Sequence, residues 1–196
     1  MKGENFGKSV EKLSELVLSQ MPGINEKMAL DATALIKDRI VNTGVDAKGN
    51  SLGSYSDNEL PAFFFKGKAL NAGGTKLYED VTTGKKKKGQ IKKGISYKEW
   101  REANNRPTDH VTLSFSGTTM KDIGVVKILE GGNKIVTVVG SKNTKTRQNG
   151  DNTETIVDDY LGPKYGNFLE PNEREIQIME DILIANVQNL INDSFK

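Results

Sequence analysis

The stretch Gly124-Val-Val-Lys-Ile-Leu-Glu-Gly-Gly-Asn-Lys-Ile-Val-Thr-Val-Val-Gly140 decides the fold class of this 196-residue chain. Two runs rich in β-branched residues, 124–129 and 134–140, flank a short connection at 130–133 that contains two glycines. Such runs favour strands, and a glycine-rich connection between them is typical of a hairpin. The stretch therefore predicts an antiparallel β-hairpin, which is the clearest strand signal in the chain.

Helical periodicity dominates the N-terminal part of the sequence. Apolar residues at spacings of three and four predict helices at 6–20 and 25–41, separated by a break at Pro22-Gly23. The apolar face predicted for the second helix consists of Met28, Ala32, Leu35, Ile36 and Ile40. The charged triplet 37–39, which includes Arg39, falls largely off that face.

A long helix is predicted at the C-terminal end. Pro171 lies at its first turn, where Glu173 and Glu175 complement the positive end of the helix dipole. The buried stripe predicted for it consists of Ile176, Met179, Leu183, Val187, Leu190 and Ile191. N-terminal helices, a small antiparallel sheet and this long C-terminal helix make the predicted fold class α+β.

The segment at about 44–94 is predicted to be a long loop or an extended arm of a single domain that covers 1–196. Glycine, asparagine, aspartate and serine crowd residues 44–57, which favours turns. Residues 66–94 are rich in glycine and lysine and show weak periodicity. A structureless segment of this length is uncommon inside a compact domain and usually has a function or is disordered.

Regular structure is expected again from Ser96 onward. Ser96 is placed to cap a short helix, with Glu99 as its capping-box partner, and Arg106-Pro107 is the predicted stop. The residues predicted to share one face of that helix are Tyr97, Trp100, Arg101 and Asn104. The alternation of apolar and polar residues at 111–116 then has the period of a strand.

The composition excludes several classes of site. Hydrophobic residues make up 35% of the chain and glycine contributes 20 residues, which predicts a modest core with long loops. The chain has no cysteine and a single histidine, His110, so thiolate metal sites and disulfides are excluded and a histidine-dependent triad is hard to build. Because no apolar run approaches the roughly 20 residues needed to cross a bilayer and no secretory signal begins the sequence, we expect no membrane contact.

A search for catalytic groups predicts that the protein is not an enzyme. His110 lies between Asp109 and Val111 without a nucleophile motif, so a structural or surface role is expected for it. The acidic pairs 79–80 and 158–159 lack a third ligand at a recognised spacing. No nucleotide-binding glycine loop is present. We therefore predict no catalytic, metal or cofactor site and no cofactor.

Charge is distributed unevenly along the chain although the net charge is only +2. Residues 66–106 contain twelve basic and four acidic residues, a balance of +8, and residues 151–196 contain three basic and ten acidic residues, a balance of −7. The candidate basic loop consists of Lys85, Lys86, Lys87, Lys88, Lys92 and Lys93. The candidate acidic inter-subunit face consists of Asp151, Glu154, Asp158 and Asp159. Opposite patches steer contacts between copies or attract a charged partner.

The lysine run has three interpretations. A solvated, mobile loop is the simplest one. Docking on an acidic protein or lining a DNA passage are the others, since each neutralised phosphate would add salt dependence to binding. No aromatic residue interleaves with the lysines for base stacking, so sequence-specific reading of nucleic acid is not expected.

Residues 96–120 resemble tailed-bacteriophage morphogenesis proteins of the neck and tail-completion kind. That family carries a Tyr-Lys-x-aromatic-Arg stretch, an Arg-x-Thr-Asp stretch and a Leu-x-x-Ser/Thr-Gly-x-Met motif. The matching positions here are Tyr97, Lys98, Trp100 and Arg101, then Arg106, Thr108 and Asp109, then Leu113, Ser116, Gly117 and Met120. The last motif contains one inserted residue, at 118 or 119. The glycine-rich loop at 44–56 and the ending from Tyr165 are similar to the family as well, except that Gly166-Asn167 replaces its Arg-Pro pair.

The resemblance implies a structural subunit of a phage virion, made in the host cytoplasm and incorporated at the neck. It implies a homo-oligomeric ring around the DNA channel of the head–tail connector, in contact with a portal or adaptor protein and with tail proteins, and non-specific contact with packaged DNA. Two alternatives come from the residues themselves. One is a nucleic-acid-binding accessory protein that uses the lysine-rich loop, and the other is a small metal-dependent hydrolase or nuclease whose carboxylates are dispersed along the chain.

Overall fold

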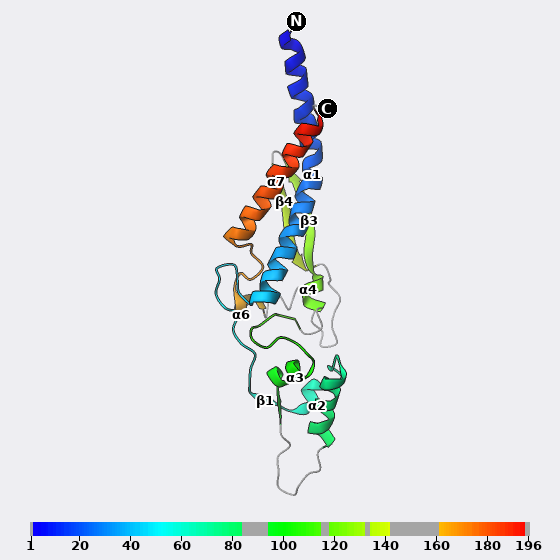
Figure 1. Cartoon of the computed structure of the whole chain (residues 1–196), viewed down its shortest axis with the longest axis vertical. Helices are drawn as coiled ribbons and strands as arrows, with labels where there is room; N and C mark the ends of the chain where they lie inside the picture. Colours follow the sequence, from blue (N-terminus) through cyan, green and yellow to red (C-terminus); the bar gives the residue numbers. More distant parts are fainter. Residues whose placement is uncertain (1, 84–93, 115–117, 132–133, 142–160, 195–196) are drawn as a thin grey trace.

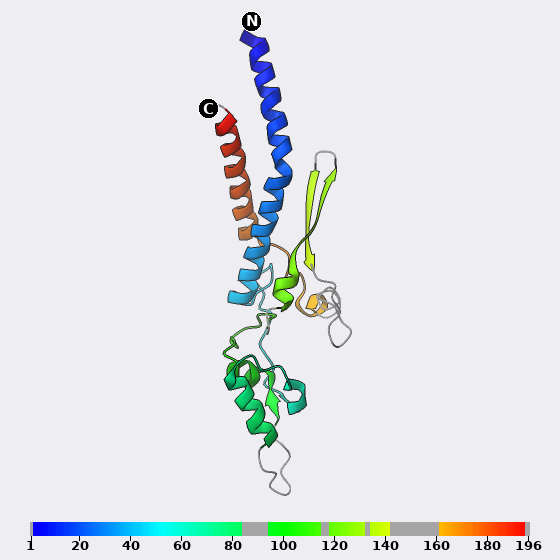
Figure 2. The ribbon, with the colours of Figure 1, turned by 90° about the vertical axis from the view of Figure 1, so that its right-hand side faces the viewer.

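The computed structural model describes residues 2–83, 94–114, 118–131, 134–141 and 161–194 of the chain. Its upper part, which we call the body, consists of three layers. Helix α1 (Lys2–Thr43) lies in the middle, helix α7 (Glu173–Ser194) runs antiparallel to it on one side, and a β-hairpin lies on the other side (Figure 2). A smaller lobe hangs below the body, and both chain ends lie at the top (Figure 1). Helices with small antiparallel sheets confirm the α+β class.

Helix α1 is continuous through Pro22, so the predicted break at Pro22-Gly23 is wrong. A proline inside a helix removes a hydrogen bond and crowds the preceding turn, at a cost of about 3 kcal/mol. Tertiary packing offsets this cost. Leu13 and Val17 before the proline, and Ile24 and Met28 after it, are all partly buried, and α1 packs along α7 (Figure 2). We attribute the continuity of α1 through the proline to this packing.

The hairpin prediction is confirmed. Strand β3 (Ile123–Gly131) pairs antiparallel with β4 (Lys134–Ser141), and Leu129 lies opposite Val136. The register shifts between Val125 and Lys127, which is a β-bulge in β3. The hairpin lies against α1, and the short helix α4 (Thr118–Asp122) leads into β3.

The body has its own hydrophobic core, located where the lower end of α1 meets the start of β3 and the segment before α7. Its buried members are Ile36, Ile40, Leu52, Val111, Met120, Ile123 and Phe168. A short helix, α6 (Gly162–Tyr165), leads toward Phe168. Because these residues come from elements spread over most of the chain, the core joins the N-terminal and C-terminal parts of the sequence into one unit.

The lobe combines part of the segment predicted as a loop or arm, at about 44–94, with the short helix predicted after Ser96. It contains strand β1 (Glu59–Leu60), the 3-10 helix η1 (Ala62–Phe65), helix α2 (Ala72–Thr83), strand β2 (Ile95–Ser96) and helix α3 (Tyr97–Ala103). A second hydrophobic core lies here, with Phe65, Ile95 and Trp100 as its buried residues. The prediction of an unstructured arm across 44–94 is therefore wrong for η1 and α2.

The glycines of α2 explain why this helix was missed. A Cβ atom built on Gly73 would lie 2.4 Å from the carbonyl oxygen of Ala103, and one on Gly74 would lie 2.3 Å from the side chain of Asn104. Only glycine allows α2 to approach the end of α3 so closely. The two glycines reduce helix propensity, so the local sequence resembles a loop although packing against α3 holds the helix.

Helix α3 begins as predicted. Ser96 and Glu99 form the reciprocal capping box, in which the Ser96 hydroxyl accepts the Glu99 N–H. The helix ends at Ala103, three residues before the predicted stop at Arg106-Pro107. Asn105 has a positive φ of 56°, so the chain has already left the helix. The described residues 111–114 do not form the strand that the alternation predicted, and Val111 and Thr112 are buried side by side.

Helix α7 begins at Glu173, two residues after Pro171, and its predicted stripe is only partly correct. Met179, Leu183, Val187, Leu190 and Ile191 are half-buried, whereas Ile176 is exposed. One helix and one hairpin cover α1, and α7 lies on the outside of this arrangement (Figure 2). Ile176 and Ile184 of α7 remain exposed although the helix packs against α1.

Candidate functional site

The charged residues that the sequence singled out lie outside the described residues. These are Lys85, Lys86, Lys87, Lys88, Lys92 and Lys93 in the first stretch, and Asp151, Glu154, Asp158 and Asp159 in the second. The structure does describe the residues that flank each stretch. The lysine stretch connects α2 to β2 in the lobe, and the acidic stretch connects β4 to α6 in the body. The two stretches thus start from different parts of one molecule.

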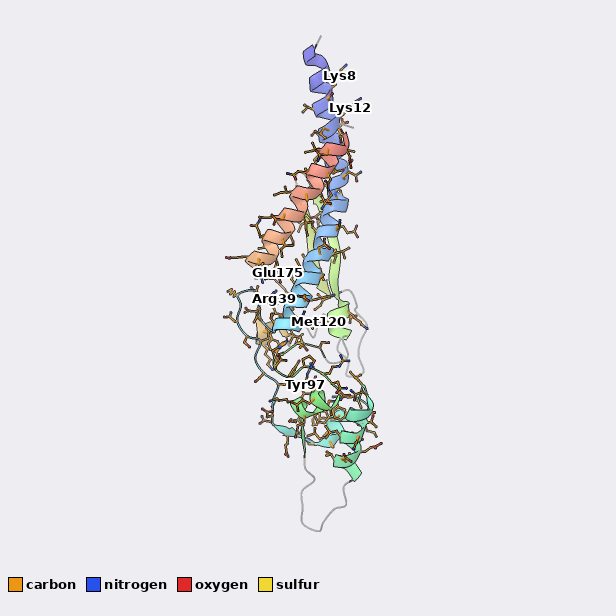
Figure 3. All side chains as sticks on the ribbon, in the orientation of Figure 1. Lys8, Lys12, Arg39, Tyr97, Met120 and Glu175 are labelled. Carbon is orange, nitrogen blue, oxygen red and sulfur yellow. The ribbon has the colours of Figure 1, made fainter. Side chains whose placement is uncertain are left out.

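Arg39, which the sequence placed largely off the apolar face of its helix, is the centre of a buried polar network in the body (Figure 3). Its Nε donates a hydrogen bond of 2.8 Å to Oε1 of Glu175, which is also buried. Nη1 donates to the carbonyl of Val45, and Nη2 donates to the carbonyls of Phe168 and Glu170. All three guanidinium nitrogens therefore have acceptors, as a buried arginine requires.

Glu175 has a second structural role at the start of α7. Its Oε2 accepts the N–H of Asn172 at 2.8 Å, and Oδ1 of Asn172 accepts the N–H of Glu175 at 2.8 Å. This reciprocal pair is a capping box. One carboxylate thus caps α7 and neutralises an arginine of α1 that lies 136 residues away in sequence. No local pattern pairs residues so far apart, and sequence reasoning assigned only the dipole role to Glu175.

Arg101 forms a second buried network, at the junction between lobe and body. Its Nε donates to the carbonyl of Pro107 at 2.9 Å, Nη1 donates to the carbonyl of Ser114, and Nη2 donates to the hydroxyl of Thr112 at 3.1 Å. The guanidinium carbon lies 4.1 Å from the centre of the Tyr55 ring. Among the described residues no carboxylate forms an ion pair with Arg101. Its charge is balanced by carbonyl dipoles and a ring face.

Tyr55 joins the turn-rich loop to this network. Its hydroxyl accepts the N–H of Thr112 at 2.9 Å and lies 3.1 Å from the Thr112 hydroxyl. The Tyr55 ring meets that of Tyr97 edge-on, with centroids 5.5 Å apart. Burial raises the pKa of Tyr97 above its usual value of 10.0, so this phenol remains neutral. The network therefore holds three chain segments together without a carboxylate ion pair among the described residues.

His110 is engaged through both ring nitrogens. Nδ1 lies 2.8 Å from Oδ2 of Asp109, and Nε2 lies 2.8 Å from the carbonyl oxygen of Val41 in the last turn of α1. The Val41 carbonyl, aided by Asp109, raises the pKa of His110 above 6.5, and the hydrogen bond from His110 lowers the pKa of Asp109 below 3.8. Two acceptors favour the doubly protonated ring, so His110 acts as a cap on α1.

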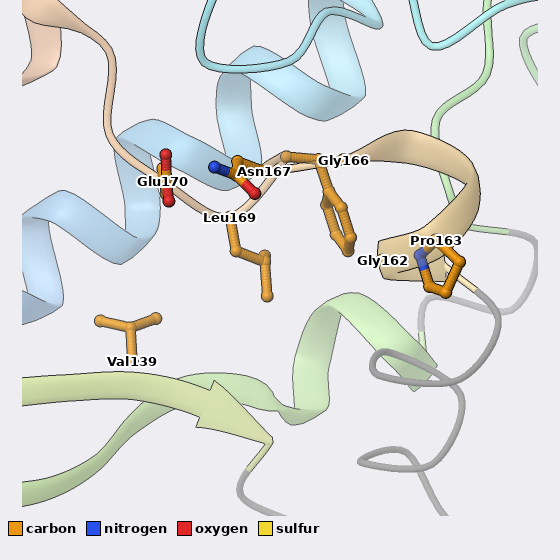
Figure 4. A pocket seen from close by; sticks show the side chains of 8 residues that line it. Val139, Gly162, Pro163, Gly166, Asn167, Leu169 and Glu170 are labelled. Carbon is orange, nitrogen blue, oxygen red and sulfur yellow. The ribbon is translucent and has the colours of Figure 1, made fainter.

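Two open hollows lie beside the segment that leads into α7. The first, of about 590 Å³, lies between Val139 of β4 and residues 162–170 (Figure 4). Leu169 and Val139 contribute apolar surface, and Glu170 is at the edge. The second, of about 650 Å³, lies between residues 47–49 and residues 170–176. Among the described residues, no three His, Cys, Asp or Glu side chains are grouped so as to hold a metal ion.

Besides those on α1, exposed apolar side chains are found on the hairpin, on η1 and on α7. On the hairpin they are Leu129, Val136 and Val138, on η1 they are Phe63 and Phe64, and on α7 they are Ile176 and Ile184. The rings of Phe63 and Phe64 stack with centroids 4.6 Å apart, and Phe63 is 68% exposed. Exposed apolar groups that cluster on single elements are candidate contacts for another protein. Among the described residues, no helix has the length and apolar character needed to span a bilayer.

In comparisons with known proteins, no family model, no curated protein and no solved structure matches this chain. Functional inference for this chain therefore depends on its own residues and contacts.

Proposed function

We propose that this chain is a non-enzymatic structural subunit of a phage virion, forming part of the head–tail connector ring around the DNA channel. The observation that carries the proposal is where the motif residues of 96–120 lie. Trp100 forms the core of the lobe, Arg101 ties the lobe to the body, and Met120 belongs to the core of the body. The motif that resembles neck proteins therefore supplies architecture, as expected for an assembly subunit.

The surface of the molecule supports the same proposal. The hairpin, η1 and α7 each expose apolar side chains, and these elements lie on different parts of the molecule (Figure 1). A subunit inside a ring needs at least two different contact surfaces, one for each neighbour, and further surfaces for the components above and below. Several separate apolar surfaces on one elongated chain suit this requirement, with a portal or adaptor protein and tail proteins as the further partners.

The opposite charges of the lysine-rich and acidic stretches provide a test of how copies meet in the ring. We expect charge reversal of Lys85–Lys88 to glutamate, or of Asp158 and Asp159 to lysine, to weaken ring formation, because each change places like charges at the contact. A mixture of the two variants restores complementary contacts and is expected to assemble better than either alone. Negative-stain electron microscopy and light scattering of the purified chain measure this. Assembly unchanged in all three samples would remove the charge contact from the proposal.

Localisation in the particle tests the proposed function itself. We expect mass spectrometry of purified virions to detect the protein, and electron microscopy of virions carrying a tagged copy to show a ring at the head–tail junction. A protein found only as free chain in infected cells, and absent from purified particles, would overturn the proposal. Duplex binding by the isolated protein that weakens steeply with salt would instead favour the nucleic-acid-binding alternative.

A further inference from the structure

The two outer edges of the hairpin differ in how well they resist pairing with another strand. Natural sheets protect their edges with charged residues, bulges or proline. Strand β3 has a bulge between Val125 and Lys127, and it carries Lys127 and Glu130 in its sequence. Strand β4 has neither device between its ends, because residues 135–139 read Ile-Val-Thr-Val-Val without charge, glycine or proline. Among the described strands, β4 pairs with β3 alone, so its other edge has no strand partner.

The outward face of β4 is apolar as well. Val136 is 50% exposed and Val138 is 39% exposed, and Leu129, opposite Val136 on β3, is 43% exposed. Val139 packs instead against the core of the body. Packing against α1 and the core of the body stabilises the hairpin, but it leaves Val136, Val138 and Leu129 exposed. The strand edge and the apolar face therefore both favour an additional strand beside β4.

We propose that the uncovered edge of β4 pairs with β4 of a second copy of this chain, antiparallel and centred on Thr137, to form a four-stranded sheet across a two-fold axis. In this register Val136 of one copy lies opposite Val138 of the other, on both sides of the axis. The four exposed valines thereby cover one another, with Leu129 of each copy next in the row.

Charge supports this register over its neighbours. The only charged residue of β4 is Lys134, and the proposed register places it opposite Gly140 of the other copy, so the two lysines do not meet. A shift of two residues in one direction would place Lys134 opposite Val138, and a shift in the other would place Val136 opposite Gly140. Only the register centred on Thr137 places both Val136 and Val138 of one copy opposite valines of the other copy. A two-fold contact of this type is self-complementary, as a closed dimer requires. The hairpin is one of the apolar surfaces on which the proposed function relies, and we assign it to a two-fold contact between copies.

The first experiment measures the oligomeric state of the full chain in solution. Light scattering of the unmodified protein is expected to show a concentration-dependent species of twice the 21.6 kDa chain mass. The double substitution Val136→Lys and Val138→Lys places like charges opposite each other and is expected to raise the dimer dissociation constant about tenfold or more. The control is Leu18→Lys on α1, which changes an apolar side chain that is more exposed than either valine and lies on a different element, and it is expected to leave the dimer intact.

The register is tested by mixing two variants. Copies with Val136→Lys and copies with Val138→Glu place opposite charges across the proposed pair, so the mixture is expected to dimerise more tightly than either variant alone. Equal weakening in the mixture would overturn the register. A strictly monomeric unmodified protein, or an equal effect of Leu18→Lys, would overturn the interface. Far-UV circular dichroism and Trp100 fluorescence verify that each variant is folded.

A cross-linking experiment keeps the surface of β4 nearly intact. Because the chain has no cysteine, a single Thr137→Cys substitution places the only thiol of each copy on the proposed two-fold axis. Mild oxidation is expected to yield a disulfide-linked dimer, which reducing agent dissolves. Lys127→Cys, on the bulged strand β3, is the control and is expected to stay unlinked. Cross-linking of the control without cross-linking at position 137 would overturn the proposal.

Discussion

The body and the lobe junction each bury one arginine, Arg39 and Arg101, and the two arginines are neutralised in different ways. Arg39 in the body has a carboxylate partner, Glu175, and three carbonyl acceptors. Arg101 at the junction has two carbonyls, one hydroxyl and the face of Tyr55. A charge pair leaves a full opposite charge behind when one partner is removed, whereas dipoles and a ring leave only unpaired polar groups. The body is therefore expected to be more sensitive to loss of its arginine than the junction.

The largest effect is expected for Arg39→Ala. This change leaves the Glu175 carboxylate buried without its cation and leaves three carbonyls without a donor, so we expect a loss of about 3–5 kcal/mol in the free energy of unfolding. Urea unfolding followed by far-UV circular dichroism measures it. Arg174→Ala removes an exposed arginine next to Glu175 and is the matched control, for which we expect a change within about 0.5 kcal/mol. Equal effects of the two substitutions would show that the ion pair does not stabilise the body.

A smaller effect is expected for Arg101→Lys. Lysine keeps the positive charge but lacks the planar fork, so it cannot reach the carbonyls of Pro107 and Ser114 and the hydroxyl of Thr112 at once. We expect a loss of about 1–3 kcal/mol in the free energy of unfolding, from the acceptors that remain unpaired. Trp100 is the only tryptophan and lies in the core of the lobe, so its fluorescence reports on this region.

The two arginine variants also differ in where unfolding begins. In Arg101→Lys, the fluorescence transition of Trp100 is expected to occur at lower urea than the transition in helical circular dichroism, most of which comes from α1 and α7. In Arg39→Ala, we expect the two transitions to occur at the same urea concentration, or the helical transition to occur at lower urea than the fluorescence transition. If the fluorescence and circular dichroism transitions of Arg101→Lys occur at the same urea concentration, the substitution does not destabilise the lobe separately from the body.

The smallest effect is expected from His110, which links the end of α1 to the segment after the lobe. Because the pKa of His110 in the folded protein lies above its value of 6.5 in the unfolded chain, its stabilising contribution is complete below pH 6.5 and is lost as the pH rises through the folded pKa. The lowered pKa of Asp109 keeps that carboxylate ionised throughout this range.

Thermal unfolding between pH 6 and pH 8 measures the His110 contribution. We expect a higher midpoint at pH 6 and expect His110→Gln to remove most of the difference, because an amide N–H can still donate to the Val41 carbonyl but does not titrate. A pH difference that persists in His110→Gln would assign it to other groups.

Some of the structure follows from local sequence. The hairpin was predictable because two β-branched runs flank a glycine-rich connection, and the capping box of α3 was predictable because Ser96 and Glu99 stand at the required spacing. The existence of α7 was predictable from its period, although not its full pattern of burial. Each of these features depends on residues within a few positions of one another, so neighbouring sequence contains the whole signal.

The tertiary structure alone decided the rest. Helix α1 is continuous through Pro22 while it packs against α7, and contact with α3 holds α2 despite its two glycines. Arg39 meets Glu175, and Arg101 meets Tyr55, only after distant segments have folded together. Sequence alone therefore determined the elements whose stability is local, whereas the partners of buried charges were determined by packing, because a buried charge is stabilised by whichever acceptors the folded chain brings within reach.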